Sequence, residues 1–158
     1  MRDAVWSEET EDITYEANRI WANANVLRGT YMPDKYGDVI IPMTVLRRLE
    51  CTLEATKDKV LKKYEADPGR APKALCRDAG LQFYCTSRFT LAELLNDTDN
   101  LAANFFSYLD GFSANVQDIF SGLSLRDHIK RMAEHNCLLP IVQNFATMDL
   151  HPNRFDSS

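Results

Sequence analysis

The sequence predicts an all-α fold, a compact multi-helix domain built on an N-terminal helical hairpin. Two apolar stripes with three- and four-residue spacing indicate the two helices of the hairpin, and a short turn containing Gly29 separates them. Farther along, short helical patterns alternate with capping residues and glycines. Because 158 residues are enough for one domain with its own core, we expect a single domain over residues 1–158.

The hairpin is predicted from local signals. Its first helix begins near Ser7 as N-cap and ends at Leu27, before Gly29. The second opens near Pro33, and Pro42 is expected to kink or break it. The first stripe comprises Ile13, Ala17, Ile20, Trp21, Ala24 and Leu27. The second comprises Tyr36, Val39, Ile40, Met43, Leu46, Leu49 and Leu53.

The middle of the chain is more polar. Beyond Leu53, residues 57–67, KDKVLKKYEAD, have helical spacing but many charges, which predicts an extension past the core with a solvated face. Residues 67–72, DPGRAP, predict a loop. Residues 72–80 predict a short helix that ends at Gly80, and residues 81–85, LQFYC, predict a short strand or extended segment.

Further helices are predicted from their N-caps. Thr90 and Glu93 form the pattern of a capping box. Asn100, Ser113 and Ser124 are expected to cap three more helices. Residues 138–145 are expected to form a last helix. The aromatic residues at helical spacing are expected in the core. The tail, residues 149–158, reads as polar and loose, and its lack of a closing helix indicates truncation.

Composition limits the function classes. The net charge is −5, which is unusual for a domain that grips DNA unaided. An acidic start without an apolar signal region, and the lack of a long apolar run, indicate a cytoplasmic protein without a membrane partner. The scattered cysteines predict buried free thiols rather than a zinc site, and they are Cys51, Cys76, Cys85 and Cys137.

No catalytic residue and no metal site is predicted. His128 and His135 lie seven residues apart, which places their rings about 10 Å apart on a helix, too far for one ion. An exposed helical face is the simpler interpretation. An enzyme that uses the His128 region remains a weaker alternative.

One local concentration of basic residues is a candidate DNA-binding surface. Its members are Arg28, Arg47, Arg48, Lys57, Lys62 and Lys63, and Lys59 lies in the same run. Lysine and arginine on one helical surface neutralise phosphates and give salt-sensitive binding. Alternatively, Glu54, Asp58 and Glu65 pair with them along the helix. The residues alone leave both interpretations open.

Several motifs in this order resemble a known family. They are Trp21-x5-Leu27-Arg28-Gly29, then Tyr36-x2-Val39-Ile40-x-Pro42-Met43-x2-Leu46-Arg47-Arg48-Leu49, and later Leu81–Tyr84, Phe89–Leu95 and Tyr108–Ile119. Together they resemble the N-terminal helical domain of the methylation (M) subunit of type I restriction–modification systems. The resemblance runs from about Ile13 to Phe155.

The resemblance implies a parent enzyme that methylates adenine N6 in double-stranded DNA with S-adenosylmethionine. It implies specificity (S) and restriction (R) subunits, the subunit's own catalytic domain and duplex DNA as partners, and a role in assembly and DNA clamping. The 158 residues contain neither an Asn/Asp-Pro-Pro-aromatic loop nor two glycines within seven residues of each other. We therefore expect an N-terminal piece of a larger M subunit, inactive alone. The alternative is a free-standing helical adaptor with no nucleic-acid role.

Overall fold

The all-α prediction is confirmed by a computed structural model, which describes residue 18 and residues 22–152. Residues 22–27 are helical, and most of the first predicted helix, including Ser7, Ile13 and Trp21, lies outside the described residues. The α-helices that follow are α2 (Tyr36–Leu53), α3 (Lys57–Ala66), α4 (Pro72–Ala79), α5 (Leu91–Leu94), α6 (Leu101–Asp110), α7 (Ala114–Gly122), α8 (Leu125–Glu134) and α9 (Leu138–Ala146). Three 3₁₀ turns join them: η1 (Pro33–Lys35), η2 (Glu54–Thr56) and η3 (Thr98–Asn100).

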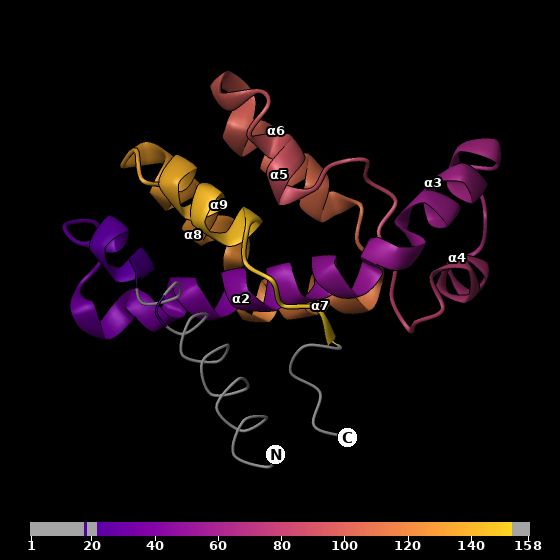
Figure 1. Ribbon diagram of the computed structural model, residues 1–158, viewed down its shortest axis with the longest axis horizontal. Helices are drawn as coiled ribbons and strands as arrows, with labels where there is room; N and C mark the ends of the chain where they lie inside the picture. The colour runs from indigo at the N-terminus through magenta and orange to yellow at the C-terminus, as the bar shows by residue number, and fades with distance from the viewer. Residues whose placement is uncertain (1–17, 19–21, 153–158) are drawn as a thin grey trace, which may run out of the picture.

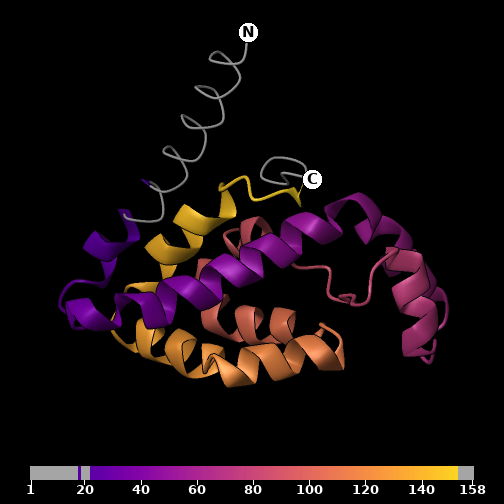
Figure 2. The same cartoon turned by 90° about the horizontal axis from the view of Figure 1, so that it is seen from below.

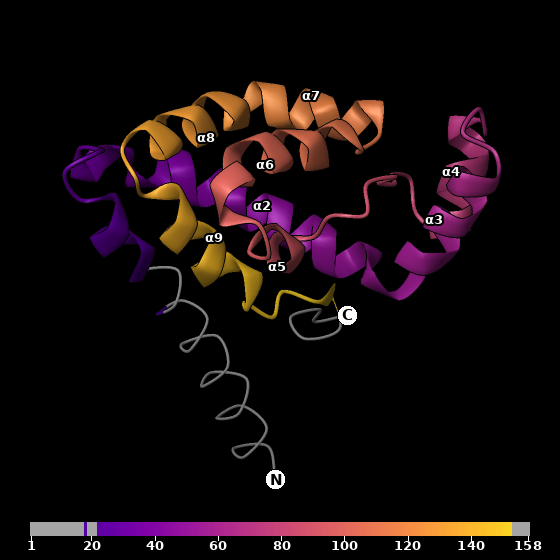
Figure 3. The same cartoon turned by 90° about the horizontal axis from the view of Figure 1, so that it is seen from above.

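Helix α2 runs along the bundle, with α7 and α8 on one side of it and α5 and α9 on the other (Figure 3). Gly29 closes the preceding turn with a φ of 91°, the left-handed conformation that the sequence predicts. A helix break at Pro42 was the wrong expectation, because α2 continues through this residue. Pro42 is buried together with Met43 and Leu46, and this packing offsets the one lost backbone hydrogen bond.

Helices α3 and α4 form an arm at one end of the molecule (Figures 1 and 2). They pack mainly against each other, and η2 joins α3 to the end of α2. The loop at residues 67–71 and the end of α4 at Gly80, whose φ is 70°, agree with the sequence prediction. The charged stretch after Leu53 is therefore the predicted extension past the core.

The caps follow the prediction only in part. Thr90 accepts a hydrogen bond from the Glu93 backbone N–H at 3.1 Å, but the Glu93 carboxylate accepts from Asn96. Asn100 and Ser113 stand at the predicted N-caps, yet the Asn100 amide donates to Asp97 and the Ser113 hydroxyl to Asn115. These helix starts were therefore predicted correctly, whereas packing and local side-chain partners replace the expected capping bonds.

The core lies between α2 and helices α5 to α9. Its largest fully buried side chains include Leu27, Met43, Leu46, Leu91, Leu94, Phe105, Tyr108, Leu109, Phe120, Leu125, Ile129 and Phe145. Tyr108 lies 5.2 Å from Phe112 between ring centroids, and Phe112 lies 5.3 Å from Phe120 in a T-shaped contact. These three rings join α6 to α7 through the apolar interior.

The segment after α9 is not loose up to residue 152, which corrects the sequence prediction. Met148 and Leu150 are 0% and 8% exposed, and the segment lies along α2. We call residues 148–151 the strap. Of the two alternatives predicted for residues 81–85, a strand or an extended segment, the structure shows the second: these residues are non-helical and form only an isolated antiparallel bridge, between Cys85 and Phe112.

Gly111 lies at a close approach between two segments, where the Thr86 N–H donates to its carbonyl at 2.8 Å. A Cβ on Gly111 would lie 2.7 Å from the Ser87 backbone nitrogen, so Gly111→Ala forces the backbone apart. We expect it to lower the free energy of unfolding by about 1–3 kcal/mol, measured by urea denaturation. Gly122→Ala is the matched control, because its Cβ meets open space. Equal effects of the two substitutions would contradict the prediction.

Candidate functional site

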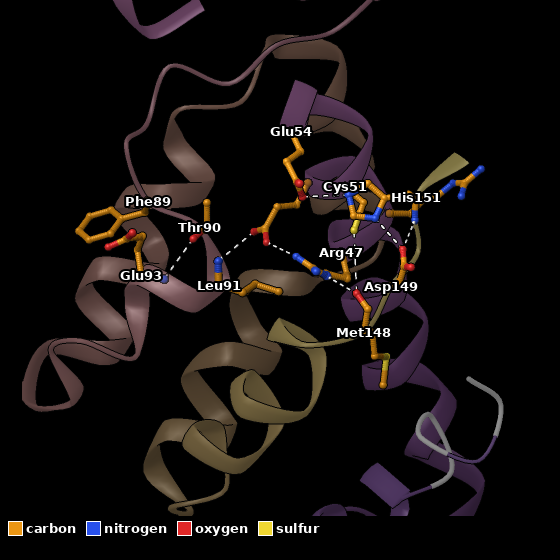
Figure 4. A network of polar contacts seen from close by, with 12 residues as sticks. Arg47, Cys51, Glu54, Phe89, Thr90, Leu91, Glu93, Met148, Asp149 and His151 are labelled. Atoms are coloured by element: carbon orange, nitrogen blue, oxygen red, sulfur yellow. Dashed lines mark hydrogen bonds and ion pairs between the residues drawn. The ribbon is translucent and has the colours of Figure 1, made fainter. Parts of the chain in front are cut away.

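Two predicted DNA-binding residues, Arg47 and Arg48, hold the strap. Arg47 Nε donates to the Met148 carbonyl at 2.7 Å, and Arg48 Nη1 donates to the Leu150 carbonyl at 2.6 Å. Figure 4 shows Arg47 between the strap and the interior. Both guanidinium groups therefore have protein partners roughly 100 residues away along the chain. A contact of either with DNA stays a prediction.

Glu50 lies at the centre of the buried polar network and was not singled out from the sequence. It is 8% exposed, and its Oε1 accepts from Arg47 Nη1 at 2.5 Å. Its Oε2 accepts from the Leu91 N–H at 2.9 Å and from the Tyr108 hydroxyl at 2.6 Å. Burial, together with the neighbouring Glu50 carboxylate, raises the pKa of Tyr108, so its hydroxyl stays neutral and donates. This network joins α2, α5, α6 and the strap.

The other candidates separate into engaged and exposed residues. Lys57 Nζ donates to the carbonyls of Ser87 and Phe89 at 2.9 and 3.1 Å. Arg28 is exposed, and its guanidinium donates to the Asn25 side chain at 3.1 Å. Lys62 and Lys63 are exposed on α3. The six predicted residues therefore do not form one continuous surface, and DNA binding by each stays a prediction.

A cavity of about 270 Å³ lies beside the network and is lined by Arg47, Glu50, Lys57, Cys85, Thr90 and Tyr108, among others. Its cysteine is a candidate nucleophile by residue type. However, burial raises the pKa of the Cys85 thiol to about 11, so it stays protonated at neutral pH. The Glu50 carboxylate, which also lines the cavity, already accepts three hydrogen bonds. The hydrogen bonds of Glu50 hold α2, α5 and α6 together and so stabilise the fold.

His151 closes the strap over the end of α2. Its Nδ1 lies 2.6 Å from Asp149 Oδ1 and its Nε2 lies 2.9 Å from Glu54 Oε2 (Figure 4). Hydrogen bonds first to Asp149 and then to Glu54 raise the pKa of His151, because both favour the protonated ring. The sequence analysis assigned no role to this residue.

The His151 contacts predict a pH dependence. Because the pKa of His151 is higher in the folded protein than its unfolded value of about 6.5, protonation of the ring stabilises the fold. This stabilisation is fully present below about pH 6.5 and is lost as the pH rises through the pKa of the folded state. We expect the difference in free energy of unfolding between wild type and His151→Gln to shrink from about pH 6 to about pH 8. Urea denaturation at both pH values measures it. A difference that does not change with pH would contradict the prediction.

The second histidine region is also structural. The Tyr31 hydroxyl lies 3.0 Å from His128 Nδ1, and the Arg131 guanidinium lies 4.7 Å from the centroid of the Tyr31 ring. His128 is half-buried, which corrects the expectation of an exposed face, whereas His135 is exposed.

Within residues 22–152, no group of three or more His, Cys, Asp and Glu is placed to hold a metal ion. No helix of this part of the chain is long and apolar enough to cross a membrane.

The glycine-rich turn expected for S-adenosylmethionine is not found among residues 22–152. The expected pocket needs a strand that turns into a helix at closely spaced glycines. Residues 22–152 contain isolated β-bridges but no longer strand. The two glycines closest in sequence, Gly29 and Gly37, are separated by the 3₁₀ turn η1 and the first residue of α2.

The fold and the network define an all-α scaffold domain in which buried polar groups join distant segments. The family model described as "HsdM N-terminal domain" matches residues 17–145. The chain belongs to this family, the N-terminal domain of the methylation subunit of type I restriction–modification systems. Comparisons with curated proteins and with solved structures found no match.

Proposed function

We propose that this domain helps to assemble a type I methylation subunit with its specificity and restriction subunits and closes around duplex DNA beside the recognition sequence. The family match over residues 17–145 carries the proposal. The exposed apolar side chains of Met32 and Ile41, 70% and 57% exposed near the start of α2, support a protein contact there. The exposed lysines of α3 support a DNA contact at the other end.

The parent enzyme in this proposal transfers a methyl group from S-adenosylmethionine to N6 of adenine in double-stranded DNA. Its own catalytic domain would bind the cofactor. Methylated sites would be protected in the host, while the restriction subunit cuts unmodified DNA. The complex would act in the cytoplasm.

The experiment is a reconstitution of the M subunit that carries this domain with its S subunit. Size-exclusion chromatography measures co-elution, and labelled S-adenosylmethionine measures methyl transfer to duplex DNA. We expect both to depend on the domain, and digestion of the product to release N6-methyladenine. Co-elution and methyl transfer that are unchanged when the domain is deleted would overturn the assembly role, and a methylated cytosine would overturn the adenine assignment.

The free-standing adaptor is the second candidate, and the cavity beside the exposed Ile41 supports it. Ile41 lines a cavity of about 270 Å³ with Gly37, Leu123 and His128, among others. An adaptor would bind a protein partner there with an affinity that does not depend on DNA or on the S subunit. The reconstitution separates the two candidates. If the chain is a domain of an M subunit, its deletion impairs methyl transfer, whereas the loss of a free-standing adaptor leaves methyl transfer unchanged.

A further inference from the structure

Positive charge is concentrated in one part of this acidic chain. Residues 57–88 contain eight Lys and Arg and four Asp and Glu, a net charge of +4. The whole chain carries −5, so the remaining residues carry −9. The positive part contains α3 and α4, the arm that projects beyond the bundle in Figures 1 and 3. An anionic polymer is therefore attracted to the arm and repelled by the rest of the molecule.

Helix α3 presents its lysines on one side. Val60 is 1% exposed and Tyr64 half-buried, which marks the inner face of the helix. Lys59, Lys62 and Lys63 are exposed, and the helical repeat places them within one arc of about 100°. Lys62 points directly away from the inner face, whereas Lys63, three residues after Val60, lies at its edge. We call these three residues the lysine face. They span about 6 Å along the helix axis.

Two nearby carboxylates, those of Asp78 and Glu65, already have arginine partners. Asp78 accepts from Arg70 Nε and Nη2 at 2.7 and 3.0 Å, and Glu65 pairs with Arg88 at 2.5 Å. The hydrogen bond from Arg70 lowers the pKa of Asp78, and Lys63 and Lys59 lower it further through charge alone. None of the ion pairs among the described residues involves the lysine face. The ion pairs along the helix that the sequence offers as the alternative are therefore not formed by these three lysines, although the exposed Asp58 lies four residues before Lys62.

We propose that the lysine face binds the phosphate backbone of duplex DNA, a proposal that rests on the function proposed above and specifies the surface. Duplex DNA carries one negative charge per about 1.7 Å of axis, which supplies a phosphate for each lysine within this span. Protein interfaces have apolar cores from which lysine is depleted. Among the described residues, the large exposed apolar side chains are Met32, Ile41 and Ile119, and none lies on α3. The face therefore suits phosphate better than a protein partner.

The contact is independent of base sequence. Each lysine ammonium is a point charge on a flexible stem, which neutralises a phosphate without reading a base edge. The lysine face consequently positions the domain on DNA, whereas the recognition sequence is read elsewhere in the complex. This also separates the lysine face from Arg47 and Arg48, whose guanidinium groups hold the strap.

The test measures binding of the 158-residue chain to a fluorescent duplex DNA from about 50 to about 200 mM salt. The variant is Lys62→Gln/Lys63→Gln. The matched control is Lys35→Gln/Lys130→Gln, which removes the same charge from two exposed lysines on η1 and α8. We expect the α3 variant to weaken binding equally for different DNA sequences and to reduce the slope of log K against log salt by about 2. The control should change the slope little, and circular dichroism should show that both variants are folded.

Several results would overturn the proposal. Equal losses in the two variants would show that total charge, not the lysine face, governs binding, while the proposed role in the methyltransferase would still stand. Binding to polyglutamate but not to duplex DNA would assign the face to an acidic protein. No DNA binding by the wild-type chain would show that the lysine face is not a DNA-binding surface by itself. Only the reconstitution described above, in which methyl transfer is measured, tests the function on which this proposal rests.

Discussion

Replacing Glu50 by alanine is expected to lower the free energy of unfolding by about 3–5 kcal/mol. The substitution removes the acceptor of the Arg47 guanidinium, the Leu91 N–H and the Tyr108 hydroxyl at once. Tyr108 is 1% exposed, so its hydroxyl loses a buried acceptor when the carboxylate is gone. Since domains of this size are stable by about 5–15 kcal/mol, Glu50→Ala removes a large share of the total.

Tyr108→Phe is the control for the Glu50 prediction. It removes one hydroxyl but keeps the ring and leaves the carboxylate with its other donors, Arg47 and Leu91. We expect a loss of about 1–2 kcal/mol, measured with Glu50→Ala in the same urea series. If Glu50→Ala cost no more than Tyr108→Phe, the carboxylate would not be the centre of the network.

Replacing Phe120 by alanine is the second large expected loss, about 3–5 kcal/mol. Phe120 is 1% exposed and packs edge-on against Phe112, which in turn contacts the ring of Tyr108. The cavity left by the ring removes apolar contacts between α7 and the core. Because Tyr108 also donates to Glu50, we expect looser packing of these rings to weaken the hydrogen bonds of the polar network as well.

Ile119→Ala is the matched control on the same helix. Ile119 is 43% exposed, so its truncation removes little buried surface, and we expect a loss below about 1 kcal/mol. Thermal and urea unfolding of both variants measure the difference. Comparable losses at positions 119 and 120 would mean that α7 does not pack against the core through Phe120.

Much of the fold could be predicted because its signals are local. The proline at the start of α4, Gly80 at its end and the spacing of Val39, Met43 and Leu46 each act within a few residues. The strap could not be predicted, because Arg47 and Met148 are 101 residues apart and their contact depends on the packed helices. The continuation of α2 through Pro42 likewise depends on tertiary burial, which overrides the local preference.

The candidate site was predicted by residue type but not by environment. The sequence groups Arg47, Arg48 and Lys57 with the exposed lysines, and only the structure shows that their donors are bound to protein acceptors. Glu50 was missed although a signal existed. It lies four residues after Leu46 and three before Leu53, which places a carboxylate within an apolar stripe. A charge in such a position needs buried partners, and Arg47 is one of them.

The most direct test of the central claim is lysine footprinting of the M–S complex with and without duplex DNA. A small acetylating reagent modifies exposed lysines, and mass spectrometry reports the rate at each position. We predict that duplex DNA slows acetylation of Lys62 and Lys63 on α3 but leaves Lys35 and Lys130 unchanged, all four being exposed in the free domain. Protection of Lys35 and Lys130 with Lys62 and Lys63 still reactive would contradict the claim that this domain meets DNA through its α3–α4 arm.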